Sequence, residues 1–199
     1  MVELISGGIC AAKGFKANGV HCGIRKNRSK RDLALIYSTV PASAAAVYTT
    51  NLVKGAPLTV TKRHLENGIA QAIICNSGNA NTCNADGIDV AETMSRLVAD
   101  ELGIAADDVV VASTGVIGQP LDVTPIKNGL PALAEGLSEE GAEAAAEAIL
   151  TTDTVKKEVA VSFTVGGKVC RLGGIAKGSG MIHPNMATTH QPGQGNSLF

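Results

Sequence analysis

The chain has 199 residues, of which 45% are apolar and 18% are charged, and its formal net charge is −1. This composition excludes an intrinsically disordered chain, and the near-zero charge provides no field that would draw the protein to nucleic acid or to a membrane. Aromatic residues make up only 3% and tryptophan is absent, so Ala, Val, Ile and Leu are expected to build the core.

The cysteines and the hydropathy pattern exclude further classes. The five cysteines are odd in number and form no CxxC pair, and no two histidines have the spacing of zinc ligands, so neither a disulfide framework nor a metal site is expected. No apolar run approaches the roughly 18 residues of a membrane-spanning helix, and no signal-peptide pattern opens the chain. These patterns predict a cytoplasmic protein, with Cys75 and Cys170 as buried thiols in apolar strands.

A basic run precedes the first predicted strand. Its members are Arg25, Lys26, Arg28, Lys30 and Arg31. Such a run can form a nucleic-acid patch, but no aromatic residue lies within it to stack on a base. We therefore interpret the run as the solvent-exposed face of a loop.

Three strands are predicted in the first half of the chain. Residues 33–38 and 44–49 have the pattern of strands joined by a short turn around Pro41. Residues 69–76 form a continuous apolar run that is too short for a helix and has the length of a buried strand.

An Asn/Gly loop at residues 76–81 is expected to follow the third strand. Its three asparagines, Asn76, Asn79 and Asn81, can line a polar pocket or, as is commoner for this residue type, adopt left-handed backbone angles and bond their own turn. The next segment, residues 88–102, has apolar residues at helical spacing before Gly103, which is a typical stop.

The following elements are a strand and shorter helices. Residues 107–112 are rich in valine and predict a strand. Residues 123–137 have helical character, but three residues interrupt it and predict two short pieces: Pro125, Gly129 and Pro131. Ser138 and the two glutamates after it open an alanine-rich helix that extends to about Leu150.

The last predicted element is a hairpin. Residues 158–165 and 168–175 alternate around Gly166-Gly167, a two-residue turn signal. We find no repeat and no interdomain linker. Short strands interleaved with helices therefore predict an α/β protein, and a layered sandwich is favoured over a doubly wound sheet.

Thr114 and Gly115 follow directly on the predicted strand 107–112. A threonine hydroxyl and a glycine N–H that point at one place would stabilise the oxyanion of an acyl-transfer intermediate. The alternative is a strand-to-turn transition in which glycine supplies an unusual φ and threonine a cap. The residue types alone leave both interpretations open.

The segment from Lys177 to Thr188 combines a lysine, a glycine-rich turn and a threonine behind Ala187. Threonine is a weak nucleophile until a base takes its proton. Cutting the Ala187–Thr188 bond would free an α-amino group beside the hydroxyl, and this amine can act as the base. Strain in the glycine-rich turn would assist an N→O acyl shift onto Thr188. A phosphate-binding loop is excluded, because Lys177 precedes its glycine and Pro184 prevents a regular helix.

Four other segments occur with this one in a fixed order: Asp32–Ser38 with Thr49–Asn51, then Asn76–Asn81, Ser113–Gly118 and Thr151–Thr154. Because of these five segments, the chain resembles the ornithine acetyltransferases, also called glutamate N-acetyltransferases, of arginine biosynthesis. The resemblance covers about residues 5–188. The resemblance implies a self-cleaving enzyme with an α-β-β-α-type sandwich. In that enzyme this chain would supply the N-terminal half, with residues 1–187 as the α-subunit-like domain.

The resemblance also implies a role for each site residue. Thr188 would be the nucleophile, the Ala187–Thr188 bond the cleavage site, and Thr114 with Gly115 the oxyanion hole. Thr188 would also contact substrate. The acetyl group would pass from N-acetylornithine to Thr188 and from this threonine ester to glutamate, without a metal or an organic cofactor. Whether acetyl-coenzyme A is a further donor is left open.

Substrate binding and partners are implied in the same way. Lys177 and Thr154 would bind substrate, with Thr152 as the neighbour that can be confused with Thr154. Cleaved members of the family assemble as α2β2 heterotetramers, so a β chain is the expected partner. No nucleic acid and no membrane is expected to bind.

Residues 188–199 depart from the family, in which an apolar stretch and a second subunit follow the nucleophile. Here Pro192, Gly193 and Gly195 exclude a central strand, so we expect a disordered tail in place of the start of a β subunit. A truncated or frameshifted copy, a cloned half with a foreign end, and a genuine product with a separate partner all stay open, as does cleavage in this chain. In each case the chain alone is expected to be inactive.

Two other functions also stay open. A self-processing aminopeptidase or amidohydrolase of related fold would use the same threonine and pass the acyl group to water. A non-catalytic remnant would only bind amino-acid ligands, and the tail is the feature that favours it.

Overall fold

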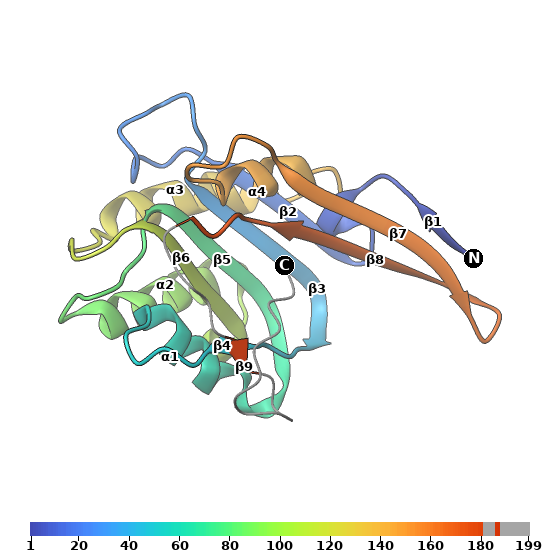
Figure 1. Ribbon diagram of the computed structural model, residues 1–199, viewed down its shortest axis with the longest axis horizontal. Helices are drawn as coiled ribbons and strands as arrows, with labels where there is room; N and C mark the ends of the chain where they lie inside the picture. Colours follow the sequence, from blue (N-terminus) through green and yellow to red (C-terminus); the bar gives the residue numbers. More distant parts are fainter. Residues whose placement is uncertain (181–185, 188–199) are drawn as a thin grey trace.

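The computed structural model describes residues 1–180 and the backbone of residues 186–187 (Figure 1). The strands are β1 (Val2–Leu4), β2 (Phe15–Val20), β3 (Leu33–Ser43), β4 (Tyr48–Thr49), β5 (Ile69–Asn79), β6 (Val109–Val116), β7 (Lys157–Val165), β8 (Lys168–Ala176) and β9 (Met186–Ala187). The α-helices are α1 (Ala56–His64), α2 (Gly87–Leu102), α3 (Thr124–Glu135) and α4 (Ala142–Ala148). Single 3-10 turns are η1 (Gly8–Cys10), η2 (Leu65–Asn67) and η3 (Ala106–Asp108).

These elements form a mixed α/β fold with two sheets and a short strand pair. The larger sheet has four strands in the order β2-β3-β5-β6, and the smaller has three in the order β1-β7-β8. In the larger sheet β2, β3 and β5 are antiparallel neighbours, whereas β5 and β6 run parallel. A parallel pair needs a crossover connection, which α2 provides, and the carboxyl ends of β5 and β6 therefore meet at one edge.

The two faces of the larger sheet carry two different cores. Successive side chains of a strand point to opposite faces, so Leu33 and Leu35 of β3 face one core while Ala34 and Ile36 face the other. The first core is large and aliphatic, and α1, α2 and α3 cover it with residues that include Val60, Met94, Val98, Ile126 and Leu133.

The second core is built from small residues of α4, β2 and β3. Ala142, Ala145 and Ala148 pack against the sheet, and a Cβ on Gly19 would lie 3.0 Å from the Ala148 Cβ and would overlap the Ala144 carbonyl. Alanines facing a glycine let helix and strand approach closely. This close approach brings the end of α4 to the carboxyl end of β5.

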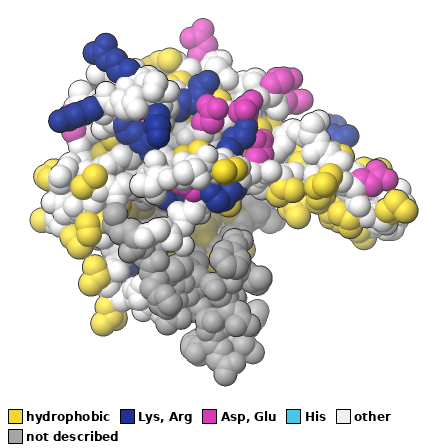
Figure 2. Space-filling view, turned by 45° about the horizontal axis from the view of Figure 1, so that its top comes forward, with side chains coloured by type: hydrophobic (Ala, Val, Ile, Leu, Met, Phe, Trp, Pro, Cys, Tyr) yellow, Lys and Arg dark blue, Asp and Glu magenta, His cyan; other side chains and the backbone are white. Residues whose placement is uncertain are grey.

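The smaller sheet projects from the body as an arm made of β1, β7 and β8 (Figure 1). Gly166 and Gly167 have φ of +56° and +77°, the left-handed angles of a two-residue hairpin turn, so the predicted hairpin is confirmed. Hydrophobic side chains gather on the arm (Figure 2), and six on its strands are exposed: Val2, Leu4, Val159, Val165, Val169 and Leu172. The arm thus presents an apolar surface to its surroundings.

Several predicted elements are confirmed. The strands at 69–76 and 107–112 correspond to β5 and β6, and α2 ends where expected, with Gly103 in a left-handed C-cap at φ +67°. β1, β2 and α1 were not predicted. No helix among the described residues has the length and hydropathy to span a membrane.

The predicted turn at Pro41 is wrong. β3 continues through this residue to Ser43, and its register against β5 shifts between Tyr37 and Ala42. Proline has no N–H to contribute to a ladder, and a bulge is one of the few places where a strand tolerates it. The predicted strand at 44–49 is accordingly only the short β4.

The predicted division of residues 123–137 is also wrong, because α3 is a single helix. Pro125 lies in its first turn, where no N–H is needed. Gly129 lets α3 pack closely against Cys22, because a Cβ at position 129 would overlap the Cβ of Cys22. Pro131 lies inside the helix without ending it.

The helix predicted from Ser138 begins only at Ala142. Ser138 instead forms an isolated antiparallel bridge with Ala17 of β2, with N···O distances of 2.9 and 3.2 Å. The Ser138 carbonyl also accepts the Gly141 N–H at 3.3 Å, so a single turn separates the bridge from the start of α4. The two thiols expected to be buried, Cys75 and Cys170, are only half-buried.

Candidate active site

Thr114 and Gly115 lie at the carboxyl end of β6, which is the edge strand of the larger sheet. Thr114 stands opposite Ser77 of β5 in the register, and Gly115 stands opposite Gly78. The Thr114 side chain is half-buried and makes no hydrogen bond within the described part of the chain. The structure thus joins the two predicted oxyanion residues to the Asn/Gly segment of β5.

Two glycines make this junction possible. Gly78 and Gly115 have φ of +139° and +135°, which L side chains rarely adopt. A Cβ on Gly115 would lie 2.6 Å from the Asn79 nitrogen and closer still to the Gly78 carbonyl carbon. Glycine at position 115 is therefore required by contact between two backbones.

The three asparagines of this region are buried and bond their own turn. Asn76 Nδ2 donates to the Asn79 carbonyl at 2.9 Å, and the Asn81 N–H donates to Asn79 Oδ1 at 2.8 Å. Asn81 has φ +47°. Asn79 Nδ2 also donates to the carbonyls of Gln119 and Pro120. The predicted hydrogen bonds within the turn are confirmed, but of the three asparagines only Asn81 adopts a left-handed backbone angle. The bonds from Asn79 also fix the loop that follows β6. The expected loop at 76–81 is in part strand, because β5 continues to Asn79.

Asp153 links the Thr-Thr-Asp-Thr segment to Lys177 and Gly178. Its side chain is only 3% exposed, and its Oδ1 accepts the Gly178 N–H at 2.7 Å and Lys157 Nζ at 2.8 Å. The Thr151 N–H lies 3.4 Å from Oδ2, and Lys177 Nζ lies 3.8 Å from it. The hydrogen bond from Lys157, followed by that from Gly178, holds the pKa of Asp153 well below its usual range. The sequence pattern predicted no role for Asp153.

Lys177 lies close to β5 as well. Its ammonium donates to the Gly178 carbonyl at 2.9 Å, and its side chain is 22% exposed. Burial raises the pKa of the Cys75 thiol to about 12, and the charge of Lys177 acts in the opposite direction. Cys75 of β5 and Ile175 of β8 pack against the same small core, and they precede Ser77 and Lys177 by two residues each.

The other predicted site residues are two threonines of the segment 151–154 and the two residues of the predicted cleavage site. Thr152 and Thr154 are both exposed, so the two stay alternatives for substrate contact. Ala187 pairs with Tyr48 through the backbone of β9 and β4. Thr188 lies outside the described residues, and so does the predicted tail at 188–199.

Arg25 corrects the interpretation of the basic run. Lys26, Arg28, Lys30 and Arg31 are exposed as expected, but Arg25 is half-buried. Its Nε donates to the Ser77 carbonyl at 3.0 Å, and its guanidinium also donates to the Leu150 carbonyl.

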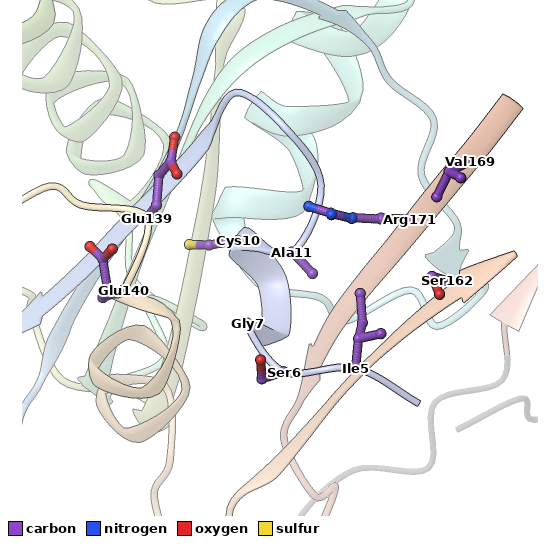
Figure 3. A pocket seen from close by; sticks show the side chains of 10 residues that line it. All are labelled: Ile5, Ser6, Gly7, Cys10, Ala11, Glu139, Glu140, Ser162, Val169 and Arg171. Atoms are coloured by element: carbon purple, nitrogen blue, oxygen red, sulfur yellow. The ribbon is translucent and has the colours of Figure 1, made fainter. Parts of the chain in front are cut away.

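A cavity of about 380 Å³ lies away from this region (Figure 3). It opens between η1, the turn before α4, and β8, and its charged lining residues are Glu139, Glu140 and Arg171. None of the predicted site residues lines it. Within the described ranges, no group of three or more His, Cys, Asp or Glu side chains is placed to hold a metal ion.

Replacing Asp153 by asparagine is expected to destabilise the fold by about 2 kcal/mol at pH 7, because hydrogen bonds to a charged acceptor are lost. The pKa of Asp153 is depressed in the folded state, so its contribution to stability is complete above the unfolded pKa of about 3.9 and is lost as pH falls below it. The difference between wild type and Asp153→Asn should therefore shrink between about pH 5 and pH 2. Urea unfolding across this range measures it, and a difference independent of pH would contradict the assigned hydrogen bonds.

The family model and the relatives that match this chain all belong to the ArgJ family. The ArgJ family model matches residues 16–190. The arginine biosynthesis bifunctional protein ArgJ of Gloeobacter violaceus is 53% identical over 188 residues, which are 94% of this chain and 46% of that protein. The ArgJ protein of Symbiobacterium thermophilum is 50% identical over 189 residues, with 94% and 47% covered. The chain spans about half the length of the curated relatives it matches.

Two solved structures are similar in fold. The crystal structure of the bifunctional protein ArgJ from Bacillus halodurans matches with a TM-score of 0.86 and 47% identity, over 94% of this chain and 98% of that chain. The ornithine acetyltransferase of Mycobacterium tuberculosis, complexed with ornithine, matches with a TM-score of 0.85 and 34% identity, over 94% of this chain and all of that chain.

Proposed function

The chain belongs to the ArgJ family, and from this premise we propose that it is the N-terminal, α-chain half of a glutamate/ornithine N-acetyltransferase of arginine biosynthesis. Such an enzyme moves an acetyl group from N-acetylornithine to glutamate. The observation that carries the proposal is the register that sets Thr114 and Gly115 opposite Ser77 and Gly78 at one edge of the sheet. The ornithine held by the Mycobacterium tuberculosis relative is the product that this donor would leave.

In the proposed reaction the Thr188 hydroxyl attacks the acetyl carbonyl while the free α-amine of Thr188 takes its proton. The Thr114 hydroxyl and the Gly115 N–H donate to the oxyanion of the tetrahedral intermediate. The intermediate collapses, the C–N bond breaks, and the ammonium returns the proton to the departing ornithine amine. The amine of glutamate then attacks the threonine ester, which regenerates the hydroxyl and releases N-acetylglutamate.

Lys177 and Thr154 are proposed to bind the substrate. A lysine ammonium is a compact cation that attracts a carboxylate such as the α-carboxylate of either amino acid. The support is the clamp formed by Asp153, which holds the segment 151–154 against Lys177 and Gly178. Because Thr154 is exposed on that segment, its hydroxyl is accessible to a ligand.

The proposal includes cleavage between Ala187 and Thr188 and assembly with a β chain into α2β2. The relatives are about twice as long as this chain, which is consistent with a second half. The exposed apolar surface of the arm and the partial exposure of Ile73 on the larger sheet favour further covering layers, as an α-β-β-α sandwich would provide. The five free thiols agree with a cytoplasmic location.

A full-length chimera tests the function. In it, residues 1–188 of this chain are followed by the remaining half of the Gloeobacter violaceus relative. Intact mass should show two chains, the shorter ending at Ala187, and the protein should transfer acetyl from N-acetylornithine to glutamate. Acetyl release to water at equal rates with and without glutamate would identify an amidohydrolase instead. An uncut chimera without either activity would indicate that the chain is a non-catalytic remnant.

A further inference from the structure

We propose that Arg25 is a positioning residue. It holds the oxyanion segment, which is Ser77–Gly78 of β5 with Thr114–Gly115 of β6, against the segment that carries Thr154. The inference rests on the proposed function, because only that function gives the two segments a common task. Arg25 itself is not placed against substrate. It acts through the backbone carbonyls of Ser77 and Leu150.

Arg25 is held in place by a buried carboxylate. Asp32 is fully buried, and it accepts the backbone N–H groups of Cys22, Gly23 and Arg25 at 2.7, 3.2 and 2.9 Å. Three such bonds fix the loop between β2 and β3 and direct the Arg25 side chain inward. The carbonyl of Asp32 also accepts the Ser77 N–H at 2.8 Å, so the same residue fastens the end of β5.

Arg25 then joins two segments that lie 52 and 125 residues away along the chain. Its Nε donates to the Ser77 carbonyl, and Ser77 stands opposite Thr114 in the sheet. Its terminal nitrogen donates to the Leu150 carbonyl, directly before the Thr-Thr-Asp-Thr segment. The Ser77 hydroxyl donates to the carbonyl of Ala148, the last residue of α4, and so reinforces the same junction.

The Arg25 stem also packs against the glycine that faces Gly115. A Cβ on Gly78 would lie 3.0 Å from Arg25 Cγ and 2.9 Å from Ile24 Cγ2. The backbone of Gly78 is therefore confined between the loop 24–25 on one side and Gly115 on the other. A shift of Arg25 would be transmitted to the two residues that donate to the oxyanion.

The chemistry of the guanidinium suits this role. It is planar and carries donors on separate nitrogens, so it can bond two carbonyls of different segments at once, whereas an ammonium is a point donor. Burial lowers the pKa of Arg25 and the charge of Asp32 acts in the opposite direction, consistent with a cation drawn out of solvent beside its counter-charge.

The test uses Arg25→Gln, Arg25→Lys and the control Arg28→Gln in the full-length chimera. Arg28 is exposed in the same loop, so Arg28→Gln removes the same charge without the two contacts. In Arg25→Gln, amide hydrogen exchange at residues 77–79 and 151–153 should accelerate by about tenfold or more, while exchange in α2 stays unchanged. kcat should fall by about 100-fold with KM within about threefold, as expected when reacting groups are misplaced by about 1 Å.

Arg25→Lys keeps the charge but can serve only one carbonyl well. Protection should return in one of the two segments, and kcat should recover in part. Arg28→Gln should match wild type in both measurements. Unchanged exchange in either segment of Arg25→Gln overturns the proposal, whatever the activity. So does exchange that accelerates equally in α2, because Arg25 would then only stabilise the fold. A wild-type chimera without acetyl transfer would refute the proposed function, while the exchange data would still decide the role of Arg25.

Discussion

Replacing Gly115 by alanine is expected to lower acetyl transfer in the full-length chimera by at least about 1000-fold. Removal of one oxyanion donor alone costs about 100- to 1000-fold. The added methyl group would stand 2.6 Å from the Asn79 nitrogen, in a residue whose φ of +135° already disfavours any side chain. β5 and β6 must separate at this point, so both the Gly115 N–H and the Thr114 hydroxyl would leave their positions. Steady-state kinetics of acetyl transfer measure the loss.

Gly118→Ala is the matched control for this substitution. Gly118 follows β6 and also has a positive φ, of +69°, but a Cβ there would meet no atom within 4 Å. Its replacement carries only the cost of a left-handed backbone, about 1 kcal/mol of stability, and the activity should stay within a few fold of wild type. If Gly115→Ala also stayed within about tenfold, the close contact with β5 would not control the oxyanion geometry.

Replacing Thr114 by valine is the second large expected effect, a fall in kcat of about 100- to 1000-fold. Valine keeps the branched shape and the strand preference of threonine and removes only the hydroxyl. The side chain is half-buried and has no hydrogen-bond partner among the described residues, so folding should be little affected. Thermal unfolding and kinetics of the same preparation separate the two effects.

Thr114→Ser restores the hydroxyl and should recover kcat to within about tenfold of wild type. A valine variant that transfers acetyl at near-normal rates would remove Thr114 from the mechanism. A serine variant as slow as the valine variant would show that shape, and not the hydroxyl, matters at this position.

Local periodicity accounts for the parts of the fold that the sequence predicted. β5, α2, β6 and the β7–β8 hairpin each have an apolar pattern and a stop signal within a few residues of one another. The wrong expectations involve contacts across the chain. Ser138 begins no helix because its backbone bonds Ala17, and Pro41 makes no turn because a bulge accommodates it.

The residues of the candidate site also fall into those that stand in local motifs and those whose roles depend on distant contacts. Thr114, Gly115 and Lys177 stand in short motifs, and the family resemblance predicted roles for them. Arg25 and Asp153 could not be given their roles, because these depend on which distant groups their side chains meet. Arg25 is one of five basic residues in a loop, and its four neighbours are exposed as expected. Nothing in the local pattern distinguishes the residue that turns inward.

The crossover that makes β5 and β6 parallel also governs when this region can form during folding. A two-residue hairpin such as β7–β8 closes within microseconds, whereas a parallel pair must wait for the intervening helix, and non-local contacts slow folding further. The Arg25 contact spans 125 residues, so it cannot form on the ribosome before Leu150 has emerged. The segment proposed to form the oxyanion hole is therefore completed late. A cleavage reaction that depends on it would report that the whole domain has folded, and the precursor would stay intact until then.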